Sequence, residues 1–367
     1  MTELVKYVPD NLPATIDGIQ TYLLIGKEQL KAHQAKLRAI DKIPEAHAAR
    51  GAALQDAQTL AKNLLAAEAK LGKMLAAAPK QGKTKEYGST GGTIPTLPPG
   101  LTKKESHQAQ TIARNPEVVE KVTAQAVVKG ELPTAKEVYK EVNKLIREAR
   151  LHEASQEVLP KQAKIINNDC LEYLDSVKPI DLLLTDPPYF TDGNFTAHIS
   201  AYLGKVKDTG QAYVFIGSSP DEVAAYLAID THRMTLEQIL VWNYNNTGQR
   251  QPNKRYTSNY QFCLYYRGPE APDINKPGDG THQYACQTIN APDGRMGDRF
   301  YVWQKPDALI ERLIRNSSNP DDFVFDPFAG SGTVVISAAR LGREAAGCEV
   351  NKDVVDICVT RGCILDV

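Results

Sequence analysis

The amino-acid sequence predicts an α/β domain with a mainly parallel sheet, preceded by an N-terminal all-helical domain. From Lys164 onward, short apolar runs such as IDLLLTD and QAYVFIG alternate with helix-like stretches such as SPDEVAAYLAI. Strands that alternate with helices in this way are typical of parallel sheets. Before that point, the chain is rich in alanine and has the apolar spacing of helices. The helix-poor run from Trp242 to Gly268 predicts an antiparallel hairpin at one edge of the sheet.

Residues 1–78 are expected to form a helical hairpin or a coiled-coil-like region. The helix-like segments run from about Thr15 to Ile40 and from about Pro44 to Ala78. The second segment carries one apolar stripe, formed by leucines at 60, 64, 71 and 75. Two interpretations remain open for this stripe. It packs inside a bundle with the first helix as an antiparallel partner, or it forms a dimerising coiled coil.

Residues 79–100 are rich in Gly, Pro, Thr and Lys and are expected to form a flexible linker. Residues 101–155 then contain the start and stop signals of three short helices. These signals are two T-x-x-E capping boxes, an Asn-Pro start and a glycine stop, at Thr102–Glu105, Thr134–Glu137, Asn115–Pro116 and Gly130. The pattern suggests a helix-turn-helix relative and loosely resembles the helical DNA-binding domains of plasmid-partition proteins. A purely structural bundle is the alternative.

Charge is distributed unevenly, although the whole chain has a net charge of only −1 at pH 7. Residues 1–150 carry 23 Lys and Arg against 16 Asp and Glu, whereas the remaining residues carry 20 against 28. A basic first part is compatible with a polyanionic partner, and also with a solvated helical surface rich in lysine.

The sequence gives no sign of a membrane segment or a metal site. It contains no run of 18 apolar residues and its N-terminus has no signal-peptide pattern, so no membrane partner is expected. Its six cysteines form no CxxC motif, and the nearest pair, Cys358 and Cys363, has no histidine nearby in the sequence. Reduced thiols in a cytoplasmic protein are therefore expected.

Residues 323–350 have the plan of a nucleoside-binding β-α-β unit. An apolar strand ends at Asp326, a small-residue turn follows at residues 330–333, and a helix then leads to a second strand that ends at Glu349. Glycines let the backbone approach a ligand, and a carboxylate at a strand end binds ribose hydroxyls. The spacing does not fit a dinucleotide fingerprint, and the sequence contains no P-loop motif.

A second strand, LLLTDPPYF, ends at the tetrapeptide Asp186-Pro187-Pro188-Tyr189. Together with the downstream run DPFAGSGT, from Asp326 to Thr333, it resembles the S-adenosylmethionine-dependent amino-methyltransferases of DNA. The order of the two motifs is that of the permuted, β-type arrangement of the family. The resemblance covers about residues 160–363. It implies a Rossmann-like methyltransferase domain at 160–367, with a small target-recognition region at about 245–300.

The resemblance also implies roles for individual residues. The catalytic residues are Asp186, Pro187, Pro188 and Tyr189. The residues that bind S-adenosylmethionine are Asp169 and Cys170 near the adenine, Lys305 and Pro306 near the methionine part, Glu349 at the ribose, and Asp326, Phe328, Gly330, Ser331, Gly332 and Thr333. No metal is implied. Strand-end caps remain the alternative for Asp169 and Glu349, and a core role remains the alternative for Phe328.

Elementary chemistry explains why Asp-Pro-Pro-Tyr suits an amino nucleophile. An aromatic amine delocalises its lone pair into the ring, so its N–H groups must be held by acceptors before the nitrogen can attack a methyl group. The Asp186 carboxylate and the Pro187 carbonyl are candidates, because proline fixes φ and has no competing N–H. Tyr189 offers a face on which a flipped base can stack.

Double-stranded DNA is the expected partner, and a homodimer is also expected. Arg250, Lys254 and Arg255 are candidates for phosphate contacts, with a solvated loop as the alternative. An aspartate in the tetrapeptide favours the N6 atom of adenine, and cytosine N4 is the first alternative. Methylation of a protein glutamine and an inactive DNA-binding regulator are further alternatives. A restriction-modification enzyme of prokaryotic or phage type, associated with the nucleoid, is the expected setting.

Overall fold

The computed structural model describes residues 12–78, 82–83, 94–95, 97–189, 194–246, 256–275, 284–293 and 299–366. The chain divides into two compact units, Met1–Leu145 and Ile146–Val367. No helix among these described residues combines the length and the apolar character needed to cross a bilayer.

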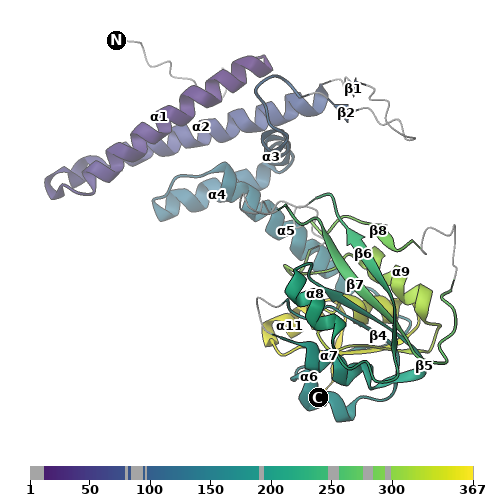
Figure 1. Ribbon diagram of the computed structural model, residues 1–367. Helices are drawn as coiled ribbons and strands as arrows, with labels where there is room; N and C mark the ends of the chain where they lie inside the picture. The colour runs from purple at the N-terminus through teal and green to yellow at the C-terminus, as the bar shows by residue number, and fades with distance from the viewer. Residues whose placement is uncertain are drawn as a thin grey trace. The chain divides into compact units, whose positions relative to one another are not determined.

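Two long helices dominate the N-terminal unit. Helix α1, Ile16–Ile40, begins at the N-cap Thr15, whose side chain accepts a hydrogen bond from Gly18 N. The 3-10 helix η2, Pro44–Ala49, reverses the chain into helix α2, Arg50–Ala77, which runs antiparallel to α1 (Figure 1). The predicted leucine stripe of α2 packs against Ile19 and Leu23 of α1. The antiparallel partner expected from the sequence is therefore present within the chain.

The next three helices begin and end largely where their capping signals predict. They are α3 (Lys103–Arg114), α4 (Pro116–Lys129) and α5 (Ala135–Ser155). Both arms of the capping boxes at Thr102 and Thr134 are formed, and Gly130 ends α4 in a left-handed conformation. Asn115 differs from expectation, because its side-chain amide donates to Thr111 O at 2.7 Å and so caps the end of α3. Helix α5, with 21 residues, is not short.

The predicted linker at 79–100 contains a small antiparallel pair. Strand β1, Gly82–Lys83, pairs with strand β2, Ile94–Pro95. Most other positions of the segment lie outside the described residues.

The C-terminal unit is built on a nine-stranded sheet in the order β11-β3-β10-β9-β4-β5-β7-β6-β8. Its strands are β3 (Ala163–Ile166), β4 (Ile180–Thr185), β5 (Val206–Ile216), β6 (Thr235–Asn243), β7 (Tyr260–Arg267), β8 (Cys286–Thr288), β9 (Phe323–Asp326), β10 (Glu344–Cys348) and β11 (Ile364–Asp366). The strands from β11 to β5 are parallel, and β7 is antiparallel to both β5 and β6. The predicted antiparallel hairpin is therefore confirmed, with β8 added outside it.

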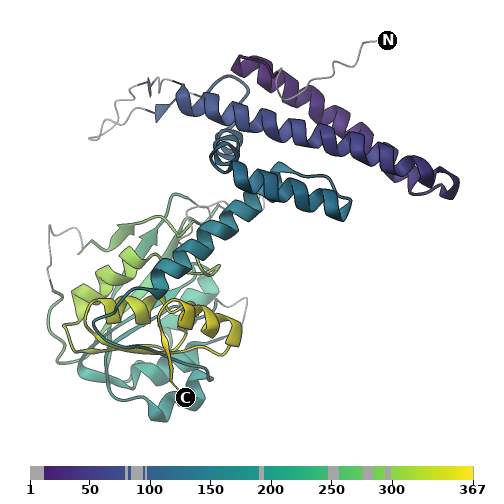
Figure 2. The same ribbon diagram turned by 180° about the vertical axis from the view of Figure 1, so that it is seen from behind.

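Helices cover both faces of this sheet (Figures 1 and 2). One core contains residues of α9 (Asp307–Ser317), α10 (Thr333–Arg340) and α11 (Lys352–Thr360). The opposite core contains residues of α6 (Cys170–Tyr173), α7 (Thr196–Leu203) and α8 (Pro220–Leu227). Strand β4 serves both cores, because Leu182 and Leu184 face the first and Leu183 faces the second. This two-sided burial explains its unbroken leucine run.

Pairing within the sheet brings the two sequence motifs together. Leu182 and Leu183 of β4 are in register with Val324 and Phe325 of β9. Because the two strands are parallel neighbours, both end at the same edge of the sheet. Asp186 and Asp326 therefore meet there, although 140 positions separate them in the sequence.

Gly72 of α2 provides a test of the helical packing. A Cβ atom at this position would lie 2.0 Å from Ala109 O of α3, closer than any real contact. We expect Gly72→Ala to lower the free energy of unfolding by about 1–3 kcal/mol, since the helices must separate. Gly51→Ala in the same helix meets nothing within 4 Å and should raise it by about 0.5–1 kcal/mol. Urea unfolding followed by circular dichroism measures both, and stabilisation by Gly72→Ala would contradict this packing.

Candidate active site

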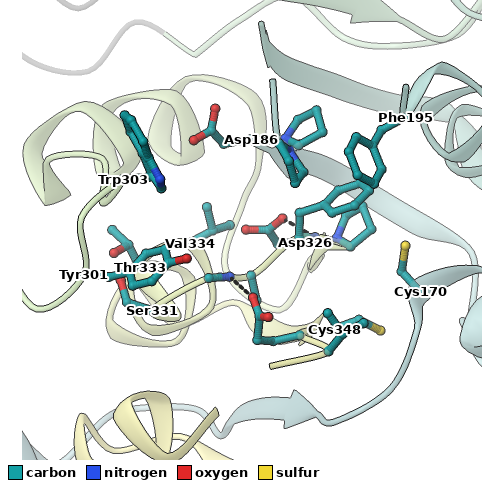
Figure 3. Close-up of a pocket in the computed structure, with 18 of the residues that line it drawn as sticks. Cys170, Asp186, Phe195, Tyr301, Trp303, Asp326, Ser331, Thr333, Val334 and Cys348 are labelled. Atoms are coloured by element: carbon teal, nitrogen blue, oxygen red, sulfur yellow. Dashed lines mark hydrogen bonds between the residues drawn. The ribbon is translucent and has the colours of Figure 1, made fainter. Parts of the chain in front are cut away.

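A cavity of about 470 Å³ lies at the carboxyl ends of β4, β9 and β10 (Figure 3). These strands are neighbours in the sheet. Its wall includes Asp186 after β4, the turn after β9, and Glu349 after β10. Open α/β sheets bind ligands at this edge, because the loops that follow the strands converge there.

Asp186 presents its two carboxylate oxygens to different surroundings. Oδ2 accepts a hydrogen bond from the Lys305 ammonium in a close ion pair. Oδ1 is buried and has no hydrogen-bond partner among the described residues. Burial raises the pKa of the Asp186 carboxyl, while the Lys305 charge and the Tyr189 hydroxyl oppose this rise. Oδ1 of Asp186 can therefore still accept a hydrogen bond from a ligand.

Aromatic side chains surround the approach to Asp186. The Tyr189 hydroxyl accepts a hydrogen bond from the Gln261 side-chain amide and lies 3.5 Å from Lys305 Nζ. Its ring meets the Trp303 ring edge to face, with 6.2 Å between the centroids. Trp303 is 53% exposed and lines the same cavity (Figure 3). The sequence did not single out Trp303 or Gln261.

Asp326 is almost wholly buried at the end of β9. Its Oδ1 accepts hydrogen bonds from the Thr185 hydroxyl at 2.7 Å and from Phe328 N at 3.0 Å. Burial raises the pKa of the Asp326 carboxyl to about 7, and the two hydrogen bonds oppose this effect. The Thr185 bond also ties the end of β4 to the end of β9.

The glycine turn after β9 needs two backbone conformations that favour glycine. Gly330 has a φ of 51° and Gly332 a φ of 79°. A Cβ atom at Gly332 would also lie 3.2 Å from Cys363 Sγ and 3.3 Å from Cys358 Sγ. The Glu349 carboxylate accepts hydrogen bonds from Gly330 N at 3.1 Å and from Asn351 N at 2.8 Å. This carboxylate is therefore fixed against the turn, and each oxygen retains a further lone pair for a ligand.

Arg361, which the sequence did not single out, holds the turn from behind. Its buried guanidinium donates to Ser331 O and lies 3.2 Å from Thr333 Oγ1. It also lies 4.6 Å from the centroid of the Phe300 ring. The Arg361 guanidinium thus connects the end of α11 with the glycine turn and with Phe300.

Phe328 belongs to an aromatic cluster on the cavity wall. Its ring lies 5.3 Å from that of Phe195 and 5.8 Å from that of His198, measured between centroids. Phe195 and His198 come from the start of α7, which has no motif that marks them in the sequence. The core role left open for Phe328 and the cavity role are compatible, because the ring is partly buried and lines the cavity.

Asp169 lies three residues beyond β3, and not at the end of that strand as the sequence suggested. It caps α6, accepting a hydrogen bond from Leu171 N at 2.8 Å. Donor atoms of Asp169, Cys170 and His198 lie within 4.8 Å of one another, a spacing that metal ligands share. Burial raises the pKa of the Cys170 thiol to about 12.

The structure places most of the predicted site residues around this one cavity. Its wall contains Asp169, Cys170, Asp186, Pro187, Pro188, Tyr189, Lys305, Asp326, Phe328, Gly330, Ser331, Thr333 and Glu349. Pro306 instead precedes α9 as its N-cap, and Gly332 turns the chain into α10. Arg250, Lys254 and Arg255 lie outside the described residues.

Comparison with known proteins places this unit in a family. Residues 180–360 match the family of N6 and N4 methyltransferases described as DNA methylase. The type II methyltransferase M1.MboII of Moraxella bovis is 27% identical over 247 residues, which cover 53% of this chain and 94% of that protein. The DNA adenine methyltransferase YhdJ of Escherichia coli K12 is 27% identical over 243 residues, which cover 54% and 81%. The matched segment of the C-terminal unit is therefore a domain of the S-adenosylmethionine-dependent DNA amino-methyltransferases.

Solved structures are also similar to the chain. The complex of M1.HpyAVI with SAM is 25% identical, with a TM-score of 0.46 over 54% of this chain and 98% of that one. The cytosine-N4-specific PvuII DNA methyltransferase is 18% identical, with a TM-score of 0.48 over 58% and 91%.

Asp326 predicts a dependence of stability on pH. Its pKa of about 7 in the folded chain exceeds the ordinary value of 3.8, so the folded state binds the proton more tightly. Its contribution to stability is therefore most favourable below about pH 4, and it is lost as the pH rises to about 7. Asp326→Asn keeps an oxygen for Thr185 and Phe328 and removes the ionisation. We expect this variant to be more stable than the wild type at pH 8, by about 1–4 kcal/mol, and similar to it at pH 4.

Urea unfolding at both pH values checks this expectation. Asp273→Asn, at a side chain that is 94% exposed, serves as the control and should follow the wild type at both. A stability difference for Asp326→Asn that is equal at pH 4 and pH 8 would contradict the assignment.

Proposed function

We propose that this protein transfers a methyl group from S-adenosylmethionine to the N6 atom of an adenine held outside the DNA duplex. One observation carries the proposal. The Asp186-Pro187 segment and the glycine turn line one cavity, which brings an acceptor for an amine next to a nucleoside-binding turn. An exocyclic amine inside a duplex is inaccessible, so the base must leave the stack. The relative named as a DNA adenine methyltransferase supports adenine.

The cavity fits the cofactor in size and charge. Its volume lies within the range of about 300–1,000 Å³ of small-molecule sites. Four carboxylates line it, from Asp169, Asp186, Asp326 and Glu349, whereas Lys305 is the single lysine among the described lining residues. An excess of acidic groups suits a ligand that carries a sulfonium cation. The bound cofactor would supply an activated methyl group, and Glu349 would hold its ribose.

Asp186 and Pro187 would prepare the amine for attack. Oδ1 of Asp186 would accept one N–H of the base and the Pro187 carbonyl the other, so that the nitrogen could pyramidalise and its lone pair would no longer be delocalised into the ring. The same carboxylate would stabilise the positive charge that develops on that nitrogen. Tyr189 and Trp303 would contact the faces and edges of the base.

The proposal also includes the binding partners of the protein and its role in the cell. DNA is the substrate, and Arg250, Lys254 and Arg255 are proposed to contact its phosphates. Leu24 and Ile25, which are 68% and 54% exposed on α1, support the proposal of a homodimer through the helical unit. A cytoplasmic role in restriction-modification is supported by the similarity to a type II methyltransferase.

Labelled cofactor identifies the base. Incubation with duplex DNA, digestion to nucleosides and chromatography should show the label in N6-methyladenine. Label in N4-methylcytosine would replace adenine by cytosine, and label on protein alone would refute the DNA assignment.

Substitution of Asp186 tests the acceptor. Asp186→Ala removes both oxygens from the cavity, so the single-turnover rate should fall about 100-fold or more. Cofactor affinity, measured by calorimetry, should change far less. Asp175→Ala, at a fully exposed carboxylate of the same unit, is the control and should retain the wild-type rate. Turnover near the wild-type rate in Asp186→Ala would show that this carboxylate is not the acceptor.

A further inference from the structure

Lys305 is a buried lysine in the wall of the cavity. It precedes α9, and its side chain is only 6% exposed. An ammonium group removed from water costs free energy unless it is paired and hydrogen-bonded. The Asp186 carboxylate supplies that pairing, and the Tyr189 hydroxyl lies 3.5 Å away.

Three aromatic rings fix the position of this ammonium. Lys305 Nζ lies 5.2 Å from the centroid of the Phe215 ring, 5.6 Å from that of Trp242, and 5.9 Å from that of Tyr189. The negative faces of aromatic rings attract a cation at such distances. These rings come from β5, β6 and the turn after β4, so the sheet itself holds the charge in place.

The lysine engages only one of the two oxygens of Asp186. Oδ2 accepts its hydrogen bond, whereas Oδ1 is buried without a partner among the described residues. A buried carboxylate oxygen without a partner is costly, so a ligand that donates there gains the full benefit. The lysine thereby determines which oxygen remains free for a ligand.

We propose that Lys305 is a positioning residue for methyl transfer: it binds Oδ2 of Asp186, keeps the carboxylate ionised in its buried site, and directs Oδ1 to the amino group of the target base. This inference rests on the proposed function. Lys305 does not contact the reacting atoms in this arrangement, and it acts through Asp186. The caged ammonium also balances the carboxylate charge when no base is present.

The other groups near Asp186 cannot replace the lysine. The titratable groups that influence or face it are the Tyr189 hydroxyl, Asp326 on β9, Cys263 on β7 and Tyr226 on α8. None of them is a cation. Burial raises the pKa of Asp186, and the Lys305 charge is the largest effect that opposes it. Loss of that charge would raise the pKa further, so the active carboxylate would be lost at a higher pH.

The pH dependence of methyl transfer tests this role. Lys305→Met should lower the single-turnover rate at pH 7 by about 100-fold on unmethylated genomic DNA with labelled S-adenosylmethionine. The acidic limb of its profile should move to higher pH by about one unit or more, so the deficit shrinks toward pH 9. Lys305→Arg keeps the charge and should retain an acidic limb near that of the wild type, at a lower rate. Cofactor affinity should stay within about threefold, a difference of less than 1 kcal/mol.

A matched control comes from the same sheet. Lys207 of β5 pairs with Asp181 of β4 at 2.7 Å, and neither residue lines the cavity. Lys207→Met should leave the rate and the pH profile unchanged. An unshifted acidic limb in Lys305→Met, or a loss explained entirely by cofactor affinity, would overturn the proposal.

A measurement without DNA separates this proposal from the proposed function. The Asp186 carboxyl can be titrated by carbon-13 NMR in the full chain, with Asp186→Asn to assign its signal. We expect its pKa to be higher in Lys305→Met than in the wild type and in Lys305→Arg. Equal values in all three proteins would refute the role of Lys305. Failure of the wild type to methylate DNA, combined with the expected titration, would refute the proposed function and leave the Lys305–Asp186 relation intact.

Discussion

The parallel pairing of β4 with β9 is the constraint on which the rest of the site depends. Each strand leads into an aspartate, and the two ends lie at one edge only because the strands are adjacent and parallel. Burial of β4 on both faces fixes its register, since a slip of one residue would exchange the two cores. The hydrogen bond from Thr185 to Asp326 joins the two ends directly. Packing far from the cavity thus determines its geometry.

The same edge concentrates carboxylates whose surroundings differ. Asp326 is held by a hydroxyl and a backbone amide, whereas Asp186 is held by a lysine. Glu349 is held by two backbone amides, one from the turn and one from the start of the following helix. Because only Asp186 is paired with a cation, the cavity combines a neutral ion pair with three further acidic groups, those of Asp169, Asp326 and Glu349. Such a division lets one site contact a cationic ligand and an amine donor.

Much of the fold follows from local patterns in the sequence. Alternating apolar runs predicted the parallel sheet, and two T-x-x-E boxes predicted helix starts that the structure confirms. Asn115 shows the limit of such rules, because its side-chain amide donates to Thr111 O of the preceding helix and makes no capping hydrogen bond to α4. The length of α5 does not follow from its capping box, because such a signal marks where a helix begins and not where it ends.

The site could be predicted only where a motif marks its residues. The tetrapeptide and the glycine turn are such motifs, and both line the cavity. Arg361 has no local signal, because its partners at Ser331 and Thr333 lie 30 and 28 residues away. For Lys305, the resemblance implied a place near the cofactor, whereas its ammonium contacts Asp186. Contacts between distant segments depend on tertiary packing, which spacing in a single sequence does not encode.

The central place of β9 has a consequence for synthesis on the ribosome. Strands β4 and β5 emerge early, whereas β9, the neighbour of β4 on the other side, follows some 140 residues later. At about 5–20 residues per second, β4 waits on the order of ten seconds with one hydrogen-bonding edge unpaired. The faces of the same strand carry the apolar leucines of the run that leads into Asp186. The permuted chain order therefore exposes a nascent chain to mispairing for longer than an order in which the two strands were consecutive.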